Sequence, residues 1–121
     1  MARARILVVD DSPTDLSIIM KPLLARGFDV ITAHDGEEAL AKAVSEHPDV
    51  ILLDVVLPKQ NGFQVCRALK RSPASSHIPV ILLTGKNQPS DRFWGLRQGA
   101  DEYVTKPFQA DALVSSIQRF L

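Results

Sequence analysis

Residues 50–54 read Val-Ile-Leu-Leu-Asp, a run of four aliphatic residues that ends at a single acid. An aliphatic run without polar alternation is typical of a strand that is buried on both faces of a parallel sheet. Residues 6–9 (Ile-Leu-Val-Val) and 80–83 (Val-Ile-Leu-Leu) repeat the pattern, and a polar residue follows each of them. These three runs predict the centre of a parallel sheet.

Two weaker runs, residues 30–32 and 102–104, extend the predicted sheet to five strands. Between the runs, apolar residues recur at the i, i+3, i+4 spacing that places them on one face of a helix. The predicted apolar faces are Leu16, Ile19, Met20, Leu23 and Leu24; Ala39, Leu40, Ala43 and Val44; Val65, Cys66 and Leu69; and Leu113, Ile117 and Leu121. Strands alternating with five helices predict an α/β fold, a doubly wound parallel sheet covered on both faces.

Capping signals indicate where the helices begin and end. Ser12 before Pro13 predicts the start of the first helix, and Asp35 with Glu38 matches a capping box at the second. An interior proline removes a hydrogen bond, so Pro22 predicts a kink, with its ring in solvent. The other helices are expected over residues 62–70, from Pro89 to the closing Gly99, and over residues 112–121.

Composition narrows the class of protein. A chain of 121 residues is expected to form one domain, residues 1–121, with no output domain attached. Lys plus Arg and Asp plus Glu both number 14, so net charge gives no reason to expect direct binding to nucleic acid or insertion into a membrane. The single cysteine, Cys66, excludes an internal disulfide, which fits a cytoplasmic protein.

The polar residues that follow the predicted strands carry the functional prediction. Asp10 and Asp11 follow the first strand, Asp54 the third, Thr84 the fourth and Lys106 the fifth. In an open parallel sheet, a site forms beyond the carboxyl ends of the strands, where the strand order reverses. If the strand order is 2-1-3-4-5, the three carboxylates converge at one edge of the sheet.

Three uncompensated carboxylates repel one another, and a hard cation such as Mg²⁺, which prefers oxygen ligands, relieves that repulsion. We expect Asp11 and Asp54 to bind Mg²⁺ directly and Asp10 to act through water. The backbone carbonyl of Val56 is a further candidate ligand.

Asp54 is the expected nucleophile, which would form an acyl phosphate. Thr84 offers a hydroxyl hydrogen bond to a phosphoryl oxygen, and Lys106 offers a long-stemmed cation that reaches across the fourth strand. Each residue alone also has a structural explanation as a cap or a turn residue. The spacing of all the positions together favours the functional interpretation.

Three blocks of sequence resemble the signatures of response-regulator receiver domains. They are residues 8–12 (Val-Val-Asp-Asp-Ser), 52–58 (Leu-Leu-Asp-Val-Val-Leu-Pro) and 103–108 (Tyr-Val-Thr-Lys-Pro-Phe). The resemblance covers the whole chain and implies a flavodoxin-like sheet with the strand order 2-1-3-4-5. It also implies a phosphoacceptor switch of a two-component phosphorelay, which is not an enzyme because it catalyses only its own phosphorylation and dephosphorylation.

The resemblance assigns roles to residues. Asp54 receives a phosphoryl group from a histidine kinase, a phosphotransfer domain or a small phosphodonor, while Asp10 and Asp11 hold Mg²⁺. Lys106 and Thr84 contact the phosphoryl group, and the bond before Pro107 is cis. Tyr103 is the switch residue, which turns inward when Thr84 moves. The surface of the fourth helix, fifth strand and fifth helix then changes for a downstream protein target, and the protein is expected to be monomeric.

A narrower resemblance lies in residues 91–100, which are similar to the fourth helix of stand-alone receivers in pilus-based chemosensory systems (twitching motility). Gly95 inside a helix costs about 1 kcal/mol relative to alanine, so we expect a structural requirement for it. Trp94 beside Arg92 is either a partner-binding surface or a residue that packs on the neighbouring strand or lies half exposed.

Three other classes of protein are alternatives to the receiver. A flavin or nucleotide carrier is disfavoured because the turn at residues 10–15 lacks glycine and repels phosphate in the absence of a metal. An aspartyl-phosphate phosphohydrolase needs a second acid two residues after the nucleophile, where Val56 stands. A constitutive protein-binding pseudo-receiver is the third alternative, and the complete set of acids, hydroxyl and lysine argues against it.

Overall fold

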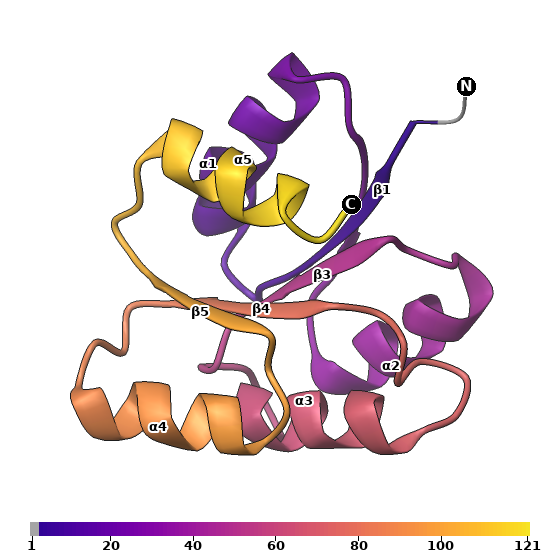
Figure 1. Ribbon diagram of the computed structural model, residues 1–121, viewed down its shortest axis with the longest axis vertical. Helices are drawn as coiled ribbons and strands as arrows, with labels where there is room; N and C mark the ends of the chain where they lie inside the picture. Colours follow the sequence, from indigo (N-terminus) through magenta and orange to yellow (C-terminus); the bar gives the residue numbers. More distant parts are fainter. Residues whose placement is uncertain (1–2) are drawn as a thin grey trace.

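A five-stranded sheet runs through the middle of the molecule in the computed structural model, which describes residues 3–121 (Figure 1). Residues 1 and 2 of the predicted domain lie outside the described residues. The strands are β1 (Arg5–Val9), β2 (Asp29–Ala33), β3 (Val50–Leu53), β4 (Val80–Thr84) and β5 (Glu102–Thr105). They pair in parallel in the order β2-β1-β3-β4-β5, which confirms the predicted α/β fold and its flavodoxin-like strand order.

Helices cover both faces of the sheet. They are α1 (Pro13–Ala25), α2 (Gly36–Ser45), α3 (Gly62–Arg71), α4 (Pro89–Arg97) and α5 (Ala110–Gln118). Figure 1 shows α1 and α5 together on one face and α2, α3 and α4 on the other. None of the helices within residues 3–121 is long and apolar enough to cross a membrane.

The sheet separates two hydrophobic clusters, and β3 supplies both. Ile51 and Leu53 point into the cluster with α2 and α3, whereas Val50 and Leu52 point into the cluster with α1 and α5. All four side chains are at most 1% exposed. This double burial explains why the strand has no polar residue until Asp54.

Three residues of the predicted apolar faces are exposed, so these predictions are wrong. Leu24 is 54% exposed, Val44 is 47% exposed and Leu121 is 56% exposed. Leu24 lies about 80° around α1 from Leu16, at the edge of the buried face. Helix α2 packs through its alanines, which leaves Val44 outside. Helix α5 begins two residues earlier than predicted and ends at Gln118, so Leu121 lies beyond it.

Two details of the predicted helices also need correction. The Pro22 ring is half-buried in α1 and not wholly in solvent. Asp35 does cap α2, because its Oδ1 accepts a hydrogen bond from Glu38 N at 2.8 Å. The reciprocal bond of a capping box is absent, since Glu38 Oε1 accepts from the backbone N of His34 instead, at 2.7 Å. Ser12 caps α1 as predicted, through a bond from Asp15 N.

Candidate functional site

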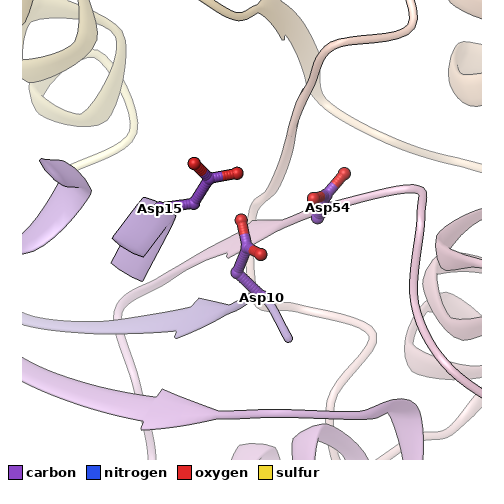
Figure 2. A group of neighbouring side chains, drawn as sticks. All are labelled: Asp10, Asp15 and Asp54. Carbon is purple, nitrogen blue, oxygen red and sulfur yellow. The ribbon is translucent and has the colours of Figure 1, made fainter. Parts of the chain in front are cut away.

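Three carboxylates meet at the carboxyl edge of the sheet (Figure 2). Oxygen atoms of Asp10, Asp15 and Asp54 all lie within 4.8 Å of one another. Asp10 and Asp54 come together because β1 and β3 are neighbours in register, with Val9 opposite Leu53. Both are buried, at 1% and 7% exposure. A close, partly buried set of hard oxygen atoms fits a divalent cation such as Mg²⁺.

Lys106 joins the three carboxylates. Its Nζ donates to Asp10 Oδ2 at 2.7 Å, to Asp15 Oδ2 at 3.0 Å and to Asp54 Oδ2 at 3.2 Å. The lysine follows β5, so its side chain crosses β4 to reach residues beyond β1 and β3. The peptide bond from Lys106 to Pro107 is cis, in agreement with the resemblance.

The electrostatics of this group follow from one lysine shared among several acids. Burial raises the pKa of Asp10 above its usual range, and hydrogen bonds from Lys106 Nζ and from Ser12 N offset that only in part. Burial also opposes the charge on Lys106, but hydrogen bonds to Asp10 and Asp15 and the charge of Asp54 raise its pKa overall. One charged lysine thus faces three carboxyl groups, and a further cation bound there would favour their ionised forms.

Asp54 is held by donors on both of its oxygens. Oδ1 accepts from Val56 N at 3.1 Å, and Oδ2 accepts from Lys106. The loop after β3 turns back sharply, because Gly62 N donates to Val55 O at 2.7 Å. A Cβ atom on Gly62 would lie 2.6 Å from Val55 Cα, so only glycine fits at the start of α3. This packing fixes the backbone that carries the Asp54 carboxylate.

The other predicted site residues are distributed around this group. Thr84 ends β4 and is fully buried, and its Oγ1 accepts a long hydrogen bond from Lys86 N at 3.4 Å. Val56 is 58% exposed, and its amide rather than its side chain contacts Asp54. Asp11 is exposed, and its carboxylate does not belong to the group of three.

Asp15 belongs to this group, whereas Asp11, which the sequence predicts as a direct metal ligand, lies outside it. The pattern of residues after the strands predicts no role for Asp15 at the site. Its position carried a usable signal, since the first turn of a helix that starts at the carboxyl edge of a sheet points its side chains toward that edge. The direction of each side chain decides which acid turns inward, and spacing along the chain does not report that direction.

Tyr103, the predicted switch residue, is buried in the structure. Its hydroxyl donates to Lys86 O at 2.7 Å, and burial, together with the charge of Asp91, raises its pKa to about 12. Arg92 Nη1 donates to the carbonyl oxygen of Tyr103 at 3.0 Å, so α4 is tied to β5 here. Lys86 thus contacts both predicted switch residues, through its amide to Thr84 and through its carbonyl to Tyr103.

Gly95 and Trp94 resolve two expectations about α4. A Cβ atom on Gly95 would lie 2.6 Å from Leu82 Cδ1 and 2.9 Å from Tyr103 Cδ2, which is the expected structural requirement for glycine. Trp94 is 54% exposed and meets Phe93 edge to face, with ring centroids 5.9 Å apart. Trp94 therefore lies half exposed and does not pack into the sheet, which is compatible with a surface that binds a partner.

An apolar groove of about 370 Å³ adjoins the acidic group. Ile18, Ile19, Pro107 and Phe108 line it, with Asp15 and Lys106 at the side of the site. Ile18 is 55% exposed on α1. The carboxylates therefore lie next to a surface on which the apolar part of a protein partner can rest.

Comparisons with known proteins agree with this geometry. Residues 6–118 match the family described as the response regulator receiver domain. The chain is 45% identical over 118 residues to protein PilH of Pseudomonas aeruginosa, and the match covers 98% of both chains. It is 46% identical to the alkaline phosphatase synthesis transcriptional regulatory protein PhoP of Bacillus subtilis, of which it spans only 48%.

Solved structures give the same result. Chemotaxis response regulator CheY4 of Vibrio cholerae has a TM-score of 0.90 at 35% identity, over 99% of this chain and all of that one. The receiver domain of sensor histidine kinase PA1611 from Pseudomonas aeruginosa has a TM-score of 0.91 at 31% identity, over 98% of each chain. That structure contains a magnesium ion coordinated in the active site cleft.

Proposed function

This chain belongs to the response-regulator receiver family of two-component phosphorelays, and from that premise we propose that Asp54 accepts a phosphoryl group in a Mg²⁺-dependent reaction. One observation carries the proposal: Lys106 Nζ contacts the carboxylates of Asp10, Asp15 and Asp54 together. That arrangement provides a nucleophile, a fixed cation and a set of metal ligands at one point.

Asp54 acts as the nucleophile in this proposal. One carboxylate oxygen forms a bond to phosphorus, while the bond from phosphorus to the donor breaks and the leaving group keeps its electron pair. The hydrogen bonds from Val56 N and Lys106 hold the carboxylate in place before the attack. Lys106 and the hydroxyl of Thr84 then donate to the phosphoryl oxygens.

Asp10 and Asp54 would hold the metal, with Asp11 and the carbonyl of Val56 as the further ligands expected from the sequence and Asp15 as the candidate added by the structure. Bound Mg²⁺ would neutralise negative charge on the phosphoryl group as it is transferred. The chain acts as a switch and catalyses only its own phosphorylation and dephosphorylation.

The output step is proposed to pass through Lys86. When the Thr84 hydroxyl turns to the phosphoryl group, it gives up the bond from Lys86 N, and the Lys86 carbonyl that accepts from Tyr103 shifts with it. Tyr103 and the surface of α4, β5 and α5 then change for a downstream protein target. Nucleic acid is not a direct partner in this proposal.

The proposed setting is a pilus-associated, chemotaxis-like pathway. The proposed partner that supplies the phosphoryl group is a histidine kinase or a phosphotransfer domain. Similarity to PilH supports this setting because it covers 98% of both chains. The proposed location is the cytoplasm, which the buried, unpaired thiol of Cys66 supports. A monomer is proposed as the working form.

The proposal is tested by incubating the protein with Mg²⁺ and acetyl phosphate and recording its intact mass. We expect one added phosphoryl group, which is lost in Asp54→Asn and without Mg²⁺ but retained in Asp49→Asn, a control in an exposed loop. Failure of both phosphorylation and beryllofluoride binding in the unaltered protein would favour the pseudo-receiver. Turnover of a model phosphate ester would instead favour the phosphohydrolase.

A further inference from the structure

A groove of about 360 Å³ lies between α3 and α4, which are neighbours on one face of the sheet (Figure 1). Arg67, Lys70 and Arg71 line it from α3, and Trp94 and Arg97 line it from α4. These residues lie in the second halves of their helices. Because helices of this fold begin at the carboxyl edge of the sheet, the groove lies toward the opposite edge from Asp54.

The charge of this groove is not balanced within the molecule. Lys70 pairs with Asp101 at 2.8 Å. By contrast, the guanidinium groups of Arg67, Arg71 and Arg97 form no ion pair and no side-chain hydrogen bond with any of residues 3–121. The chain as a whole has a net charge of zero, so this is a local separation of charge and not a generally basic protein.

Folding alone gives little reason for this arrangement. A cation in the last turn of a helix interacts favourably with the helix dipole, which accounts for one basic residue at the end of each helix. Arg67 and Arg71 are four residues apart on α3, where two like charges destabilise a helix by a few tenths of a kcal/mol. A set of unpaired guanidinium groups around a hollow is therefore better explained by an external anion.

The exposed aromatic residues beside the groove indicate that the bound anion belongs to a protein. It is 54% exposed at the side of the groove, next to Phe93, which is 55% exposed and lies 5.5 Å below the guanidinium carbon of Arg97. Exposed tryptophan and arginine side chains that lie together are typical of the hot spots of protein–protein interfaces. Arginine also matches carboxylates in a two-point geometry.

We propose that the α3–α4 groove binds an acidic segment of a partner protein, with carboxylates on Arg67, Arg71 and Arg97 and an apolar residue on Trp94. Nucleic acid fits less well, because it is usually bound by a long basic surface that follows the phosphate backbone, whereas this chain has a net charge of zero and its arginines gather around a groove of only about 360 Å³. This groove is separate from the phosphoacceptor site, and one of its two walls is α4, which belongs to the surface proposed to change on phosphorylation.

The test uses a fluorescently labelled peptide of eight glutamates and one leucine, with anisotropy to measure affinity. Trp94 is the single tryptophan of the chain, so its fluorescence reports whether the peptide reaches the groove. We expect saturable binding that weakens as salt is added. Arg67→Glu/Arg71→Glu should weaken binding at least tenfold, whereas Arg3→Glu/Lys21→Glu, an equal charge change at exposed positions outside the groove, should change it less than twofold.

Several results would overturn the proposal. They are no binding by the unaltered protein, equal weakening in both double variants, or binding that leaves Trp94 fluorescence unchanged. Tighter binding of an eight-nucleotide single strand than of the peptide would assign the groove to nucleic acid instead. Circular dichroism melting curves of both double variants are the folding control, which separates a loss of binding from a loss of structure.

Discussion

Gly95 lies directly against the ring of Tyr103, so that a Cβ atom at position 95 would be 2.9 Å from Tyr103 Cδ2. The same atom would be 2.6 Å from Leu82 Cδ1. A glycine in α4 therefore makes the space in which the buried tyrosine hydroxyl reaches Lys86 O. Both the packing of α4 on the sheet and the position of Tyr103, the proposed switch residue, therefore depend on the absence of a side chain at residue 95.

Gly95→Ala is expected to displace Tyr103 toward solvent. Alanine gains about 1 kcal/mol of helix propensity, but crowding in a packed site costs about 1–3 kcal/mol, so we expect a net loss of about 1 kcal/mol in the free energy of unfolding. Tyr103 is the single tyrosine, so absorbance titration reads it alone. Its pKa of about 12 should fall toward the usual 10.0 as burial is relieved. An unchanged titration would contradict this, and Ser90→Ala on the same helix is the control.

Gly62→Ala is expected to be among the most damaging single changes. The added Cβ would lie 2.6 Å from Val55 Cα and 2.8 Å from the carbonyl carbon of Asp54, which are backbone atoms that cannot rotate away. We expect a loss of about 3 kcal/mol or more, measured by urea unfolding. Gly85→Ala is the matched control, because its Cβ would meet nothing within 4 Å. Equal stability of the two variants would show that the loop after β3 yields easily.

Lys106→Met tests whether the lysine holds the carboxylates together. Asp10 is 1% exposed and would be left without its cation, a change that costs about 3 kcal/mol at pH 7 without added metal. Chemical denaturation measures this loss, with Lys21→Met on the exposed side of α1 as the control. Because Mg²⁺ supplies positive charge to the same oxygens, adding it should recover part of the stability. A variant as stable as the parent in both conditions would refute the expectation.

Glu38, in the first turn of α2, is expected to make the stability of the protein sensitive to acid. Its pKa is lowered from 4.5 to about 2, first by the hydrogen bond from Lys42 and then by that from the His34 amide. A carboxylate with a lowered folded pKa stabilises the folded state above its unfolded value, and that stability is lost as pH falls from about 4.5 toward 2. Glu38→Gln should therefore reduce the loss of stability over this range.

Thermal melts at several pH values between 7 and 2 would measure the effect of Glu38. Glu37→Gln is the control, because Glu37 is exposed and makes neither of the two bonds that hold Glu38. Parallel curves for the parent protein and Glu38→Gln would show that these bonds contribute nothing to folding at acid pH.

The fold was predictable because a strand that is buried on both faces of the sheet has aliphatic residues at successive positions. The run at residues 50–54 has no polar member until Asp54, and the same holds for residues 6–9 of β1 before Asp10 and for residues 80–83 of β4 before Thr84. Helix faces were less predictable at their margins. Leu24, Val44 and Leu121 follow the helical period but face solvent, since the curvature and length of the packed surface decide where a face stops.

By itself, the sequence determined the order of strands and helices and the polar residues that lie beyond each strand, because both follow from local patterns and chain direction. Only the tertiary structure decided that Asp15, and not Asp11, turns toward Lys106. It also decided that arginines of α3 and α4 share one groove. Such contacts depend on side-chain directions and on distances between separate elements, which residue spacing along the chain does not contain.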